Sequence, residues 1–256
     1  LNNQAGGIVR SSTGNFPTNV LNAQLTNSGT LDVQRSLTVT NAGHTLDFSV
    51  GTLNLPAGQT LTINGGTTKF GGSTNLLGSG SRTIATTGTN TFDLINDLTL
   101  PAGGLVLSLG GTPTLTSSVG PVTLTNSAGS SFNFANGTIG ANVTVANQGA
   151  VTFTNVTDNG AFNNSGTLTI PSGTNSTLAG AVMNAAAGTI QLVNTGSPAT
   201  LTIANGFSNF GLIDLQADTI NNGQVTTLNV SAGTLNNQAG GIVRSSTGNF
   251  PSNVLN

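Results

Sequence analysis

The sequence predicts an all-β chain whose strands stack as a parallel β-solenoid. Three observations predict this fold. Strand-sized segments alternate apolar and polar residues along the whole chain, two short motifs return at uneven intervals, and residues 1–22 return almost unchanged as residues 235–256. Internal repeats with a period of about 20 to 50 residues are typical of solenoids, in which each coil packs only on its neighbours.

The alternating segments are rich in Leu, Val, Ile and Thr. Residues 37–39 (LTV), 61–63 (LTI) and 201–203 (LTI) are examples. Because successive side chains of a strand point to opposite sides, such segments place apolar side chains on one side and Thr on the other. Helices are not expected, because no segment keeps the apolar spacing of a helical face over about ten residues and the chain contains no Glu.

Two motifs interrupt the alternation. One places Asn, a few small residues and Gly between apolar residues, as in residues 25–33 (LTNSGTLDV) and 145–153 (VANQGAVTF). The other reads Leu-Pro-Ala-Gly, at residues 55–58 and 100–103. Gly and Asn both accept the positive φ angles of sharp turns, so these motifs predict the corners between strands.

Stacked coils align equivalent residues in ladders. Phe48, Phe70 and Phe92 are evenly spaced along the chain and predict an aromatic stack inside the solenoid. The asparagines of the first motif predict corner ladders, in which side-chain amides bond from coil to coil. These asparagines are Asn27, Asn147, Asn164, Asn184, Asn209 and Asn237.

A long repeat is superimposed on the short ones. Residues 1–22 and 235–256 differ only where Thr18 is replaced by Ser252. We therefore assign residues 1–234 to one tandem unit and residues 235–256 to the start of the next, in a longer protein whose units follow one another end to end. At about 22 residues per coil the chain forms roughly 10 to 12 coils, and at ~4.8 Å per coil one unit is roughly 50 Å long.

The Asn-x-Gly corners and the Leu-Pro-Ala-Gly segments resemble the repeat regions of giant bacterial surface adhesins, among which filamentous haemagglutinin-like exoproteins are the nearest named group. The resemblance covers essentially the whole chain and lies in composition and period. It implies a right-handed parallel β-helix, an extracellular location at the bacterial cell surface, and a role as a stalk or adhesive filament. It carries over no catalytic residue. Contacts with other cells, surfaces or matrix would involve regions outside these residues.

Composition argues against several other classes. Only 5% of the residues are charged and the formal net charge is -2, so a basic surface for nucleic acid is not expected. The chain has no Cys, which removes disulfide scaffolds and thiol catalysis. No apolar run approaches the roughly 18 residues that suggest a membrane span. No motif requires a cofactor.

Two acidic pairs, Asp93 with Asp97 and Asp214 with Asp218, come nearest to a catalytic pattern. Cleavage of polysaccharides uses two carboxylates at a defined separation, so the pairs would suit a polysaccharide-degrading β-helix enzyme or a tailspike-like protein. Basic and aromatic neighbours for a sugar are missing, and we expect turn and surface roles instead. His44 has no second ligand nearby in the sequence and no Asp-rich calcium loop occurs, so no metal site is expected.

Threonines two residues apart recur in the alternating segments. An ice- or surface-binding solenoid would align such pairs on one face, whereas the unequal coil lengths argue against this alternative. The favoured interpretation is a non-enzymatic, structural or adhesive segment of an extracellular stalk or fibre. The pairs are Thr38/Thr40, Thr60/Thr62, Thr123/Thr125, Thr167/Thr169 and Thr200/Thr202.

Overall fold

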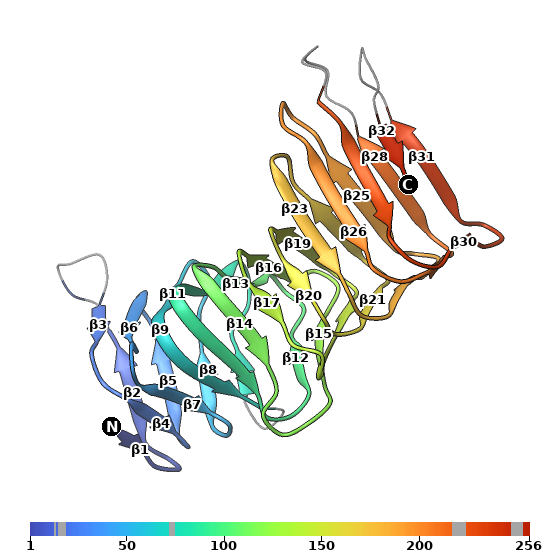
Figure 1. Ribbon diagram of the computed structural model, residues 1–256. Coiled ribbons are helices and arrows are strands. Elements are labelled where there is room, and N and C mark those ends of the chain that lie inside the picture. The colour runs from blue at the N-terminus through green and yellow to red at the C-terminus, as the bar shows by residue number, and fades with distance from the viewer. Residues whose placement is uncertain (13, 15–18, 72–74, 217–223, 247–252) are drawn as a thin grey trace.

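The computed structural model describes residues 1–12, 14, 19–71, 75–216, 224–246 and 253–256. In these residues every regular element is a β-strand, and the strands form parallel sheets. The sheets wind into a β-solenoid with coils about 23 residues apart. The first and last coils lie at opposite ends of the stack (Figure 1). The predicted fold class is confirmed.

The strands visit three faces in turn, and each strand pairs with the strand on the same face of the next coil, except that β10 and β12 on the second face are not paired. The first face comprises β1 (Asn2–Asn3), β4 (Leu25–Asn27), β7 (Thr45–Phe48), β9 (Thr60–Phe70), β11 (Arg82–Leu94), β14 (Thr112–Thr116), β17 (Thr138–Ile139), β20 (Thr157–Asp158), β23 (Thr174–Leu178), β26 (Ala199–Ile203), β29 (Thr226–Val230) and β32 (Asn253–Leu255).

The second face is divided between two sheets. One consists of β2 (Ile8–Ser11), β5 (Thr30–Val33), β8 (Thr52–Asn54) and β10 (Asn75–Leu77). The other consists of β12 (Leu98–Leu100), β15 (Val122–Asn126), β18 (Val143–Asn147), β21 (Phe162–Asn164), β24 (Val182–Asn184), β27 (Phe207–Asn209) and β30 (Leu235–Asn237).

The third face shares β9 and β11 with the first, because these two long strands continue around the corner between them. Residues 61–64 of β9 pair on the third face and residues 67–70 on the first. The other strands of the third face are β3 (Asn19–Leu21), β6 (Leu37–Thr40), β13 (Leu105–Leu109), β16 (Ser131–Ala135), β19 (Ala150–Thr154), β22 (Thr167–Ile170), β25 (Thr189–Val193), β28 (Leu212–Gln216) and β31 (Ile242–Ser246).

The core is a column of apolar side chains that runs through all coils. In most strands every second side chain is buried, as the alternation in the sequence requires. An inward row of the third face shows the continuity, since each member lies in register with the next. The row is Leu37, Leu61, Ile84, Leu107, Phe132, Val151, Leu168, Ile190, Ile213 and Val243.

Inward side chains are less completely buried in the outermost coils. Val9 and Leu21 at one end and Val243 at the other are only partly buried, whereas their counterparts in the interior coils are fully buried. Burying a Val or Leu side chain completely contributes about 1.5 to 3 kcal/mol, so each outermost coil is stabilised less than an interior one. A further coil on either end would bury the remaining surface.

Candidate functional site

The most regular polar feature is a ladder of asparagines at the corner where the second face ends, buried in every coil except the last. In every member but the last, the side-chain Nδ2 donates a hydrogen bond to the Oδ1 atom of the asparagine one coil further on, over 2.7 to 2.8 Å. A further bond from each of these Nδ2 atoms reaches a backbone carbonyl, so the buried amides are well satisfied. The ladder is Asn126, Asn147, Asn164, Asn184, Asn209 and Asn237.

Asn27 lies in a different ladder from the other asparagines of its motif. It ends β4 on the first face, and its Oδ1 accepts a hydrogen bond of 2.7 Å from Asn3 Nδ2. Asn126 belongs to the main ladder, although the sequence motif did not include it. Its environment is the same, and Ser130 Oγ donates an additional 2.8 Å hydrogen bond to Asn126 Oδ1.

The corner glycines are required for two different reasons. Gly58 and Gly103 of the Leu-Pro-Ala-Gly motif have φ angles of 76° and 96°, as predicted for a sharp turn. The prediction of positive φ is wrong for the Asn-x-Gly motif, because Gly149 and Gly166 are not in that region. There a Cβ atom on Gly166 would collide with the carbonyl oxygen of Gly149 in the adjacent coil, so close stacking selects glycine.

Replacement of one ladder asparagine should weaken the solenoid. Asn164→Ala removes the bonds to Asn184 and Thr189 and leaves the Nδ2 of Asn147 and the Oδ1 of Asn184 without their side-chain partner. We expect a loss of about 2 to 4 kcal/mol, measured by urea unfolding followed by circular dichroism. Asn163→Ala, on the outward neighbour in the same strand, is the matched control. Equal losses in both variants would contradict the role of the ladder.

The three evenly spaced phenylalanines lie in contact inside the solenoid. The ring centroids of Phe48 and Phe70 are 5.1 Å apart, and those of Phe70 and Phe92 are 5.0 Å apart with an interplanar angle of 10°. Phe48 and Phe70 are in register, but Leu94 is the backbone partner of Phe70 in the next coil. Phe92 therefore reaches the stack from two residues earlier in its strand.

A second aromatic cluster has no regular spacing, and the sequence did not reveal it. Phe153 lies 6.2 Å from Phe132 and 5.5 Å from Phe162, measured between ring centroids. Phe132 and Phe153 belong to the third face, whereas Phe162 belongs to the second. The contact crosses the interior, so a period along the chain cannot predict it.

Three of the four acids considered as catalytic candidates bond to neighbouring coils. Asp93 accepts hydrogen bonds of 2.8 and 2.7 Å from the backbone N–H and the hydroxyl of Ser118. Asp97 accepts one of 2.7 Å from the backbone N–H of Thr123. Asp214 bonds to Arg244, and Asp218 lies outside the described residues.

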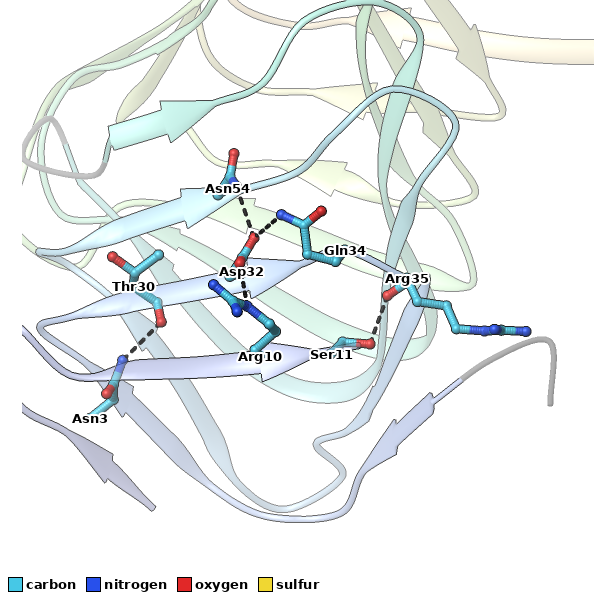
Figure 2. Close-up of polar contacts among 8 residues, drawn as sticks. All are labelled: Asn3, Arg10, Ser11, Thr30, Asp32, Gln34, Arg35 and Asn54. Carbon is cyan, nitrogen blue, oxygen red and sulfur yellow. Dashed lines mark hydrogen bonds and ion pairs between the residues drawn. The ribbon is translucent and has the colours of Figure 1, made fainter. Parts of the chain in front are cut away.

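Asp32 is the centre of a polar cluster on the second face (Figure 2). Arg10 Nε donates to its Oδ2 atom over 2.7 Å, while Gln34 and Asn54 donate to its Oδ1 atom over 2.7 and 2.8 Å. Burial raises the pKa of Asp32, but the hydrogen bonds from Gln34, Arg10 and Asn54 outweigh burial and hold the pKa below its usual value. The cluster ties three successive strands together, because Arg10, Asp32 and Asn54 are in register.

Asp214 on the third face forms a similar cluster. Arg244 Nη2 donates to Asp214 Oδ2 over 2.9 Å, and Gln216 donates to the same atom over 3.1 Å. Both carboxylates are followed two residues later by Gln, and both are buried beside a half-exposed arginine. Burial raises the pKa of Asp214, but the hydrogen bonds from Arg244, Ser246 and Gln216 outweigh burial and hold the pKa below its usual value.

Among the described residues, Asp158 is the one acid whose carboxyl group occupies an inward row. It lies in register between Ile139 and Leu178 and is fully buried. Its Oδ1 atom accepts a 2.9 Å hydrogen bond from Gly160 N–H, whereas Oδ2 has no hydrogen-bond partner. Burial raises the pKa of Asp158 to about 8 despite the bond from Gly160, so the carboxyl group is protonated in the folded chain at neutral pH.

Stability should therefore fall as the pH rises. Between about pH 4 and pH 8 the unfolded chain has released the Asp158 proton while the folded chain retains it, and the free energy of unfolding should decrease by up to about 5 kcal/mol. Asp158→Asn keeps the acceptor for Gly160 and removes the titration. We expect a flatter dependence of the urea midpoint on pH and a more stable protein at about pH 8. A variant curve parallel to that of the parent would contradict this assignment.

Two of the cavities at the surface of the described residues are considered as possible ligand sites. One of about 420 Å³ is lined by residues of β2 and β3, including Val9, Arg10 and Leu21. One of about 240 Å³ is lined by six residues around Asn155 and Thr200. Neither lining contains a carboxylate among the described residues, so neither cavity has the paired acids of a glycosidase.

The described part of the chain shows neither a metal-binding cluster nor a membrane-spanning helix. No three potential His or acidic metal ligands come together there, and His44 is an exposed corner residue. No helix among these residues has the length and apolar character needed to cross a bilayer.

The Thr-x-Thr pairs do not share one face. Those in β6, β9 and β22 lie on the third face, the one in β15 on the second, and the one in β26 on the first. A second set of threonines, which shares only Thr202 with these pairs, forms a continuous outward row on the first face, and none of them is buried. The row is Thr45, Thr67, Thr91, Thr114, Thr138, Thr157, Thr177 and Thr202.

Comparisons with protein-family models, with curated proteins and with solved structures find no match to this chain. The function is therefore inferred from the solenoid and from the ladders, ion pairs and surface rows on it.

Proposed function

We propose that this chain is a structural segment of an extracellular stalk or adhesive fibre, in which tandem units stack end to end as one solenoid. The observation that carries the proposal is the return of segment 1–22 as the last strands of the stack, where its copy continues the sheets of all three faces. The resemblance to giant bacterial surface adhesins supports an extracellular, cell-surface location.

Three properties suit a rod. Backbone hydrogen bonds run parallel to the solenoid axis and the core is continuous, so each coil is held by both neighbours. Apart from the break between β10 and β12 on the second face, the described sheets have their edges at the ends of the stack, where the next unit of an array would cover them. Only 5% of the residues are charged, so cohesion between coils depends little on ionic strength.

The enzymatic alternative has less support. Asp93, Asp97 and Asp214 each bond to a neighbouring coil, which gives these carboxylates a structural role without any substrate. A polysaccharide-degrading enzyme needs two carboxylates that converge on an open groove, and the two cavities described above offer none.

Electron cryo-microscopy of the full-length protein on cells or shed from them tests the proposal. We expect thin unbranched rods in which successive units are roughly 50 Å apart, given ~4.8 Å per coil. Globular particles, or units joined by flexible connections, would overturn the rod.

The threonine row favours a second candidate function, binding to an ordered surface such as ice. Its hydroxyl groups repeat at the coil spacing of ~4.8 Å along eight coils, which gives a regular array of donors and acceptors. If this function holds, Thr138→Lys with Thr157→Lys should abolish inhibition of ice recrystallisation, while Thr144→Lys on the second face should preserve it. No inhibition by the unmodified protein would eliminate this candidate.

A further inference from the structure

The two near-identical segments lie on different faces of the solenoid. β1, β2 and β3 of the first copy occupy the first, second and third faces. The equivalent strands β30, β31 and β32 of the second copy occupy the second, third and first faces. The copies are therefore separated by about ten whole coils and one additional face.

Both copies have the same local structure despite this shift. Gly7 N–H donates to Gln4 O over 2.8 Å, and Gly241 N–H donates to Gln238 O over 2.9 Å. Gly6 and Gly240 have φ angles of 81° and 86°. The segment thus forms three strands and the same first turn whichever face it begins on.

The repeated arginine bonds in opposite directions in its two copies. Arg10 bonds through Nε to Asp32 in the following coil, and Arg244 bonds through Nη2 to Asp214 in the preceding coil. These are different nitrogen atoms of the guanidinium group, which carries five N–H donors. One arginine at this position can therefore hold both carboxylates at once.

The repeated asparagine shows the same complementarity. Asn237 accepts from the preceding Asn209 through Oδ1, and Asn3 donates to the following Asn27 through Nδ2. An inward apolar row is complementary too, because Val243 follows Ile213 in register and Val9 precedes Leu31. In each case the first copy contains the contacts on one side and the second copy those on the other.

We propose that each unit is joined to the next, in the same chain, by an arginine clamped between the Asp214 of one unit and the Asp32 of the following unit. Residues equivalent to 23–54 would follow Asn256 and stack on β30, β31 and β32. The equivalent of Asn27 in the following unit would then extend the asparagine ladder that runs from Asn126 to Asn237. This inference rests on the tandem rod proposed above.

A rotation of the units follows from the additional face. Each unit begins one face later than the unit before it, so equivalent surfaces turn by about 120° per unit in a three-faced coil, before any twist of the solenoid is added. A given surface feature returns to the same side of the rod only after three units, which is roughly 150 Å at ~4.8 Å per coil. The threonine row would accordingly be presented on three sides in turn.

Labelling the full-length protein tests the rotation. The chain has no Cys, so Val119→Cys, at a residue that is 63% exposed, gives one maleimide–gold site in every unit. We expect labels roughly 50 Å apart along the rod that change side from one to the next and return to the same side every third label. Labels on a single side of a continuous rod would overturn the rotation while leaving the rod intact. Absence of a rod would instead refute the proposed function.

Hydrogen exchange on the full-length protein tests the clamp. Arg→Gln at the position of Arg10 and Arg244, in every unit, should accelerate amide exchange about 10- to 100-fold in both β28 and β5, because charged hydrogen bonds are lost on both sides. Arg35→Gln is the matched control, since the Arg35 side chain bonds to the carbonyl of Gly14 and should leave β28 unchanged. Acceleration on one side only would show that the arginine holds a single carboxylate and would overturn the clamp.

Discussion

Parallel stacking of one coil on the next is the constraint on which the rest of the structure depends. Successive coils lie ~4.8 Å apart, and this spacing is set by the backbone hydrogen bonds between their strands. Side chains at equivalent positions are brought within contact distance, whether they are phenylalanines in the core, asparagines at the corners or charged groups on a face. The same spacing removes the room for a Cβ atom at Gly166. A residue in this fold is therefore selected largely by the residue one coil away.

This dependence explains how much of the molecule could be predicted from its sequence. Alternation and repeated corners were sufficient for the fold class, because both are local patterns. The pairing of Asn164 with Asn184 follows from one recurring motif, whereas the position of Asn27 in another ladder depends on which face its strand occupies. The lengths of the corners decide which face a strand occupies, and these lengths vary. Consecutive ladder asparagines are separated by 17 residues in one coil and 28 in another. For the same reason, the threonine row of the first face could not be predicted from the sequence.

The buried amides and carboxylates have different consequences for stability. Each asparagine of the ladder both donates and accepts hydrogen bonds, with Ser130 supplying the donor to Asn126 Oδ1, so burial of the ladder leaves few groups unsatisfied. Asp158 has only the N–H of Gly160 as a hydrogen-bond donor and remains uncharged instead. Asp32 and Asp214 are compensated by arginine and amide donors, and they stay ionised although they are buried. Polar groups are thus tolerated inside this stack only where a neighbouring coil supplies the complementary atom or where the group carries no charge.

The stacking of coils also determines how such a rod would respond to tension. A coil adds only ~4.8 Å to the folded length, but about 23 residues of released chain extend to nearly 80 Å at ~3.4 Å per residue. Because each coil contacts only its neighbours, coils can detach one at a time from an end while the remainder stays folded. A stalk built in this way would lengthen many-fold under load before its covalent chain became taut, and it would absorb mechanical work in small steps.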